Sequence, residues 1–341
     1  GLKFDLLRLY HPRTKKGLLK SYRKASAMKA VETLLEQADH FFESVADQVR
    51  FGEYSREFRV RRPGLVENSI AGPLRELWSE IDELAQNVEG ESSKAELLDA
   101  AQKLREVHGT VQAFLDQQQE GNVYWVERGG REEIQYSLHA APVNVAEALR
   151  RLLFAPGKIC IMASATLGVG DPSLQWFKGR VGAEHVRSLT IGSPFNYKDQ
   201  MQVKIFRDMP EPSDPKYGKS LAIAIRMAVE LSKGRAFVLF TSYRAMRDVA
   251  TQLESFFRKK GWQLLVQGAG MTRHRMIEEF RSDVSSVLFG TDSFWTGVDV
   301  PGAALSQVII TRLPFDPPTH PITEAKCEHI RDSGGNPFND L

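Results

Sequence analysis

Three stretches of the first third of the chain carry apolar residues at intervals of three and four, the period of a helix with one buried face. They run from Ala27 to Val49, from Leu74 to Val88 and from Leu97 to Leu115, and Glu89–Ser93 separates the last two as a helix breaker. Each apolar stripe must be buried against another element. The pattern therefore predicts a helical bundle or insertion over residues 25–118.

The period changes after residue 120. Val123–Glu127 and Ile134–Leu138 flank Gly129-Gly130 and predict a β-hairpin. Short apolar runs then alternate with helical stretches near 218–232, 244–260, 271–281 and 321–331, as expected for a parallel, doubly wound α/β sheet. The predicted strands are Ile159–Ala163, Met201–Phe206, Ala236–Thr241, Gln263–Gln267, Ser286–Gly290 and Gln307–Thr311.

Composition excludes several classes of protein. Hydrophobic residues make up 42% and charged residues 26%, which excludes a disordered or collagen-like chain. No apolar run approaches the roughly 18 residues of a membrane span. The two cysteines, Cys160 and Cys327, have no CxxC partner or nearby histidine, so we expect packing residues rather than a disulfide framework or metal site. These features favour a cytoplasmic protein.

Basic and acidic residues are concentrated in different segments of the chain, although the net charge is only +2. Residues 1–24 hold eight basic side chains against one acidic, and residues 76–120 hold eleven acidic against three basic. The basic segment is either a strip offered to a polyanion or the solvated start of a helix.

Small hydroxyl residues and glycines follow four of the predicted strands. They are Ser164–Thr166, Thr241–Tyr243, Gln267–Gly268 and Gly290–Ser293. Ligands bind beyond the carboxyl ends of such strands, where backbone amides can approach phosphates closely. The pattern favours a polyphosphate or nucleic-acid surface at this edge.

Gly218-Lys219-Ser220 looks like the end of a phosphate-binding P-loop. The pattern requires a glycine where Ser213 stands, and the preceding segment is rich in proline instead of forming a strand. We interpret it as a helix start. The printed sequence also has no acidic magnesium-binding box, so no nucleotide site of its own is evident.

Several ordered motifs resemble the DinG-type branch of superfamily 2 DNA helicases, relatives of XPD. They are Ser164–Leu167, Gly192–Tyr197, Val238–Tyr243, Leu288–Thr291, Ser293–Pro301, Leu313–Pro318 and Gly335–Phe338, with Val123–Glu127 and Ala140–Pro142 ahead of them. The resemblance covers residues 123–341. The earlier helices match only in kind, as the arch that this family inserts in its first motor domain.

The resemblance implies a RecA-like parallel-sheet motor domain plus an all-helical arch-type insertion. Residues 1–120 would be the arch, 121–190 the end of the first RecA-like domain, and 191–341 a truncated second RecA-like domain. The family's Walker A loop and DEAH box are expected before Gly1, and its arginine-finger motif after Leu341. ATP and Mg²⁺ are thus expected only in the complete protein, with any iron–sulfur cluster in its missing N-terminal part.

The resemblance also gives roles at the nucleotide cleft. Ser164 and Thr166 would couple hydrolysis to domain closure, and the alternative is a β-turn with two satisfied hydroxyls. Asp299, with Gly297, would lie near the nucleotide, and the alternative for Asp299 is a helix or turn cap.

Nucleic-acid contacts are expected at the strand ends. Thr291 would donate to a DNA phosphate where Gly290 permits close approach. Four aromatic residues are candidates for stacking on unpaired bases, although an aromatic in such a domain can equally belong to the core: Phe195, Tyr197, Tyr243 and Trp295. Tyr197 and Trp295 are the favoured two. Further candidates for phosphate contacts are Thr241, Ser242, Gln267 and Arg244, with Arg247 one turn later.

Two classes of function remain. One is part of an ATP-dependent helicase that translocates 5′→3′ on single-stranded DNA in repair or replication. The complete protein would be a cytoplasmic, nucleoid-associated monomer. Its substrates would be forked or tailed duplexes, and its partners single-strand-binding or replication proteins. This chain alone would then be inactive in ATP hydrolysis. The alternative is a single-strand-binding or partner-interaction module, or the motor part of a nuclease–helicase fusion, without unwinding activity.

Overall fold

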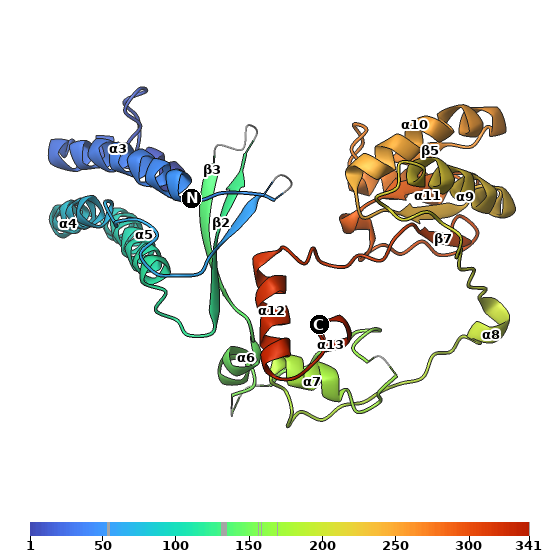
Figure 1. Ribbon diagram of the computed structural model, residues 1–341. Coiled ribbons are helices and arrows are strands. Elements are labelled where there is room, and N and C mark those ends of the chain that lie inside the picture. The colour runs from blue at the N-terminus through green and yellow to red at the C-terminus, as the bar shows by residue number, and fades with distance from the viewer. Residues whose placement is uncertain (53–54, 131–134, 156, 158, 169, 341) are drawn as a thin grey trace. The chain divides into compact units, whose positions relative to one another are not determined.

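The computed structural model describes residues 1–52, 55–130, 135–155, 157, 159–168 and 170–340. The chain forms two compact units (Figure 1). The first unit contains Gly1–Ile191 and Asp316–Leu341, and the second contains Gly192–Phe315. The polypeptide therefore leaves the first unit, builds the second and returns to the first for its last residues.

Helices form the N-terminal part of the first unit. α3 (Ala25–Gln48), α4 (Ala71–Asn87) and α5 (Glu91–Asp116) are the three helices that the apolar periodicity predicts. Their apolar faces, together with α1 (Leu2–Leu9) and α2 (Leu18–Ser21), bury one shared core. The predicted helical bundle is confirmed.

A three-stranded antiparallel sheet follows, in the order β1-β2-β3. β2 (Asn122–Gly129) and β3 (Gln135–Pro142) form the predicted hairpin, although Ile134, the predicted start of its second arm, lies outside the described residues. β1 (Glu57–Val60) pairs with β2 and was not predicted. Its four residues form too short a run to give a recognisable pattern.

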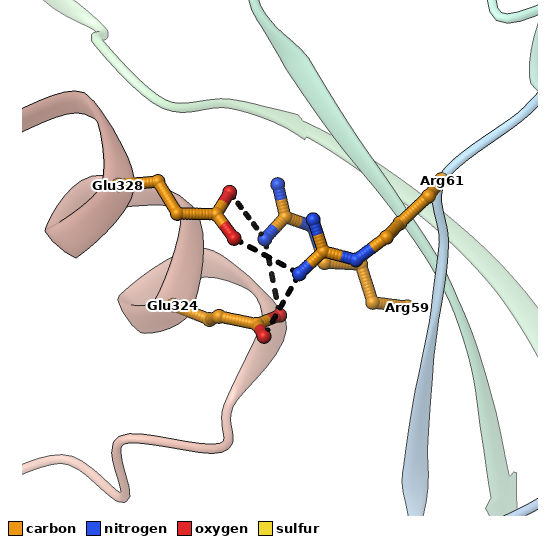
Figure 2. Close-up of polar contacts among 4 residues, drawn as sticks. All are labelled: Arg59, Arg61, Glu324 and Glu328. Atoms are coloured by element: carbon orange, nitrogen blue, oxygen red, sulfur yellow. Dashed lines mark hydrogen bonds and ion pairs between the residues drawn. The ribbon is translucent and has the colours of Figure 1, made fainter. Parts of the chain in front are cut away.

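α12 (Pro321–Asp332) packs against this sheet through Ala325, which is buried with Val123 and Trp125 of β2. Four charged side chains also join α12 to β1 and the residues that follow it, as Figure 2 shows, and we call them the arginine–glutamate cluster. In it, Arg59 of β1 and the nearby Arg61 each pair with both Glu324 and Glu328 of α12, at nitrogen–oxygen distances of 2.8–3.0 Å.

The docking of α12 is expected to weaken in acid because the pKa of Glu328 is lowered. Burial raises the pKa of Glu328, but hydrogen bonds and charge from Arg61 and Arg59 outweigh burial and hold it below its usual value. A lowered carboxyl pKa stabilises docking above the undocked pKa and loses that contribution as pH falls through the docked pKa. The protection of the α12 amides from hydrogen exchange, corrected for the pH dependence of the intrinsic exchange rate, should therefore fall below about pH 4. Glu328→Gln should flatten this dependence, and an unchanged profile would contradict the assignment.

The remainder of the first unit contains α6 (Ala146–Leu152), α7 (Gln175–Val181) and α13 (Pro337–Asp340). The predicted strand Ile159–Ala163 is wrong, because its described residues form no strand. Ile159 and Ile161 are 94% and 89% exposed. A strand exists only with a hydrogen-bonded neighbour, and none pairs with this run in the part of the chain that the structure covers.

The second unit is built on a parallel sheet in the order β5-β6-β4-β7. Its strands are β4 (Ala236–Leu239), β5 (Leu264–Val266), β6 (Val287–Gly290) and β7 (Gln307–Ile310). α9 (Tyr217–Ser232) and α10 (Tyr243–Lys260) share one core with the sheet, and α11 (Arg273–Ser282) shares another on its opposite face. The predicted α/β class and its parallel sheet are confirmed.

The predictions for two segments that precede this sheet in the chain have different outcomes. The predicted strand Met201–Phe206 is wrong: this segment follows the short helix α8 (Tyr197–Gln200) without forming a strand, and Val203 and Ile205 are 71% and 76% exposed. Gly218–Ser220, however, lies in the first turn of α9. The interpretation of this glycine–lysine–serine sequence as a helix start is confirmed.

Candidate nucleic-acid interface

The parallel strands of the second unit bring three predicted segments to one edge. Thr241–Tyr243 follows β4, Gln267–Gly268 follows β5, and Gly290–Ser293 spans the end of β6 and the short 3₁₀ helix η1 (Asp292–Phe294). We call these three segments the strand-end edge. Hydrogen bonds join them directly, because the Gln267 Nε2 donates to the Tyr243 hydroxyl at 2.7 Å and to the Ser293 Oγ at 3.0 Å.

Thr291 belongs to the third segment of this edge but does not face solvent. Its side chain is buried, with 1% of the residue exposed. Its backbone N–H and its hydroxyl donate to the Gln267 Oε1 at 2.7 and 3.0 Å. The hydroxyl that we expected to meet a phosphate is thus occupied within the protein, and it holds the amide of Gln267 in place.

Gly290 and Trp295 are fixed by packing. A Cβ at Gly290 would come within 2.7 Å of the Phe294 side chain, so glycine is required there by a neighbouring ring. The Trp295 indole N–H donates to the Phe240 carbonyl at 3.2 Å, and its half-buried ring packs on the core beneath α11. These contacts favour the core alternative for Trp295 over base stacking.

The start of α10 presents the exposed part of the edge. Ser242 caps the helix, its Oγ accepting from the backbone N–H of Ala245 at 3.4 Å. Thr241, Tyr243 and Arg244 are exposed. The N-terminus of an 18-residue helix adds partial positive charge at the same place.

The loop after η1 is held by two arginines of α11. The Arg273 guanidinium donates to the carbonyls of Ser293, Thr296 and Gly297 at 2.9–3.2 Å, and the Arg281 Nε donates to the Asp299 carbonyl at 3.0 Å. Sequence reasoning missed both arginines. A cation in the first turn of a helix opposes the helix dipole, and this was the available signal that Arg273 has a specific partner.

Gly297 and Asp299 thus lie in a loop whose backbone is clamped. Gly297 has φ +67°, a conformation that favours glycine, and Asp299 is exposed. Their assignment to a nucleotide cleft stays a prediction.

Ser164, Thr166 and Tyr197 make other contacts. In the first unit, the Thr166 N–H donates to the Ser164 Oγ at 3.2 Å, and both side chains are exposed. This is the hydroxyl-stabilised turn of the alternative interpretation, and the coupling role stays a prediction. Tyr197 of α8 is 54% exposed, and its hydroxyl accepts from the Ser193 Oγ at 2.8 Å.

Part of the basic N-terminal segment is paired within the first unit. Lys3 lies 2.9 Å from Asp39, and Lys24 lies 3.0 Å from Glu83. These ion pairs offset some of the positive charge predicted for a polyanion. They favour the alternative that the segment is a solvated helical start.

Among the residues described here, no group of three or more His, Cys, Asp or Glu side chains could hold a metal ion. Cys160 and Cys327 are free and half-buried, although the strand predicted around Cys160 is not formed. Within the described ranges, no helix is long and apolar enough to cross a membrane.

Comparisons with known proteins agree with the motifs. Residues 225–341 match the model of the helicase C-terminal domain. The ATP-dependent DNA helicase YoaA of Haemophilus influenzae is 40% identical over 221 residues, which is 65% of this chain and 33% of that protein. YoaA of Escherichia coli is 33% identical over 306 residues, covering 86% and 46%. The 3'-5' exonuclease DinG of Bacillus subtilis is 33% identical over 238 residues, covering 67% and 25%.

The chain spans between a quarter and a half of the lengths of these three relatives. The matched residues 225–341 include all three segments of the strand-end edge. The parallel sheet with helices on both faces is consistent with a RecA-like helicase C-terminal domain. The matched domain and these relatives support part of a DinG-type helicase of superfamily 2.

Proposed function

We propose that this chain is part of an ATP-dependent DNA helicase and that the strand-end edge of its second unit binds single-stranded DNA. The carrying observation is that one side chain, Gln267, joins three strand-end loops into a single surface. Two of the most similar relatives are named ATP-dependent DNA helicases, which supports DNA as the ligand and ATP as the nucleotide that is hydrolysed.

The exposed groups suit an unpaired strand. Arg244 and Arg247 are exposed on the first turns of α10 and provide positive charge for phosphates. The ring of Tyr243 is 46% exposed beside them, and an aromatic face stacks on any base. Such contacts follow the backbone and the ring faces of the strand, so binding should show weak sequence preference.

The finer properties belong to the complete protein. It would use ATP with Mg²⁺, translocate 5′→3′ and unwind forked or tailed duplexes as a monomer in DNA repair or replication, in the cytoplasm at the nucleoid. Ser164 and Thr166 would couple hydrolysis to movement, and Gly297 and Asp299 would lie near the nucleotide. The ordered motifs in which these residues stand support these assignments.

Fluorescence anisotropy with a labelled single strand tests the proposal. The 341-residue chain should prefer the single strand over the duplex. Binding should weaken steeply between 50 and 200 mM salt, about the range over which phosphate contacts release counterions. The double substitution Arg244→Gln with Arg247→Gln should lower the salt slope by about 0.7 for each contact removed.

Arg258→Gln is the matched control, since Arg258 lies in the last turn of the same helix and pairs with Glu254 at 2.6 Å. It should leave both affinity and salt slope unchanged. Equal, weak binding to single strand and duplex would contradict a single-strand site and would favour the partner-interaction alternative.

A further inference from the structure

The side chain of Gln267 has no hydrogen-bonding capacity left for a ligand. A primary amide offers two N–H donors and two acceptor lone pairs. The donors go to Tyr243 at 2.7 Å and Ser293 at 3.0 Å, and the acceptor takes two bonds from Thr291 at 2.7 and 3.0 Å. The direct phosphate contact predicted for Gln267 would therefore require one of these bonds to break.

The four hydrogen bonds fix the orientation of the amide. Both Thr291 donors point at Oε1, so Nε2 must face Tyr243 and Ser293. Thr291 is only 1% exposed and lies directly after the central strand β6, which gives the amide a rigid support. The backbone N–H of Gln267 also donates to the Phe289 carbonyl at 3.0 Å.

This arrangement fixes the orientation of Tyr243. Its backbone is set by the first turn of α10 and its hydroxyl by Gln267, while its ring stays 46% exposed. An aromatic side chain held in one orientation before binding loses little entropy when a base stacks on it. Since the Tyr243 and Ser293 hydroxyls accept from Gln267, each keeps its own proton to donate to another group.

We propose that Gln267 is a positioning residue that presents the Tyr243 ring to one unpaired nucleobase and the Tyr243 and Ser293 hydroxyl protons to the adjoining strand. This role rests on the proposed function, because it names the part of the strand-end edge that meets a base. It differs from the sequence prediction, in which Trp295 and Tyr197 were the favoured stacking residues and Gln267 met phosphate directly.

The test uses the full 341-residue chain and a single strand that contains 2-aminopurine, whose fluorescence is quenched by stacking. Quenching should be strong with the unaltered chain and lost with Tyr243→Leu. Gln267→Met, which keeps the length of the side chain but makes no polar contact, should also lose quenching and weaken affinity about tenfold, a typical contribution of one stacked base.

Gln267→Glu tests the hydroxyl protons of Tyr243 and Ser293 while the loops stay joined. A carboxylate can still accept from Thr291, and it can accept from Tyr243 and Ser293, so the loops remain tied and thermal unfolding should change little. It reverses the direction of the two outer hydrogen bonds, consumes the hydroxyl protons and adds negative charge, so strand affinity should still fall. Gln252→Met, on an exposed position of α10, is the matched control and should change neither quantity.

The double variant Gln267→Met with Tyr243→Leu should lose clearly less affinity than the sum of the two single losses, because most of the effect of the glutamine passes through Tyr243. Additive losses would overturn the positioning role, and so would unchanged quenching in Gln267→Met. Absence of single-strand binding by the unaltered chain would instead overturn the proposed function, and the role of Gln267 would fall with it.

Discussion

Replacement of Phe289 by alanine is expected to destabilise the second unit by about 3–5 kcal/mol, the usual cost of removing a buried phenylalanine ring. Phe289 lies on β6, which pairs with a strand on either side, and the residue is fully buried. Its ring centroid is 5.1 Å from that of Phe240 and 6.1 Å from that of Phe257. The substitution therefore leaves a cavity between the sheet and α10.

Denaturant unfolding followed by hydrogen exchange in β4 and β6 would measure this loss. Leu231→Ala is the matched control, because Leu231 lies on α9 of the same unit and is 69% exposed. It should change the free energy of unfolding by less than about 0.5 kcal/mol. Equal effects of the two substitutions would show that the ring of Phe289 does not carry the core.

Strands of the parallel sheet were predicted correctly where the strands that pair with them also lie in this chain. Ala236–Thr241, Gln263–Gln267, Ser286–Gly290 and Gln307–Thr311 each contain an observed strand of three or four residues. The equally apolar runs 159–163 and 201–206 form none. An apolar run with strand propensity describes a side-chain pattern, whereas a strand also needs a hydrogen-bonded partner that the run itself does not encode.

The location of the candidate site could be predicted better than the roles within it. Parallel strands must end at one edge, so the strand-end residues were identifiable from the sequence alone. Which of them face solvent was not, because Thr291 and Gln267 are paired across loops far apart in the chain. The contacts of Arg273 were missed for a second reason, since its partners are backbone carbonyls, which any sequence could provide.

The helix α12 could likewise be predicted from the sequence, but its packing partners could not. The helix predicted near 321–331 is observed, and Pro321 occupies its first turn. Its contacts lie on β1 and β2 of the first unit, whereas sequence order grouped it with the second RecA-like domain. The partners of Glu324 and Glu328 are more than 260 positions earlier in the chain, so no local pattern could reveal them.

Reversing the charges on α12 is expected to release it from the sheet. In Glu324→Arg with Glu328→Arg, four cations would replace the arginine–glutamate cluster. Arg59 is only 18% exposed, so solvent screens its repulsion less than it would at the surface. Since the glutamates are 36–39% exposed, the effect is smaller than for a fully buried pair, and we expect docking to weaken by roughly 3 kcal/mol.

Alkylation of Cys327 reports this release, because the thiol is half-buried on α12 and free. With Cys160→Ser removing the other thiol, Cys327 should react much faster in the charge-reversed chain than in its parent. Adding Arg59→Glu and Arg61→Glu restores opposite charges across the same contact and should return the slow rate. Recovery would show that charge complementarity holds α12, whereas slow alkylation already in the charge-reversed chain would assign the docking to the apolar contact of Ala325 with Trp125.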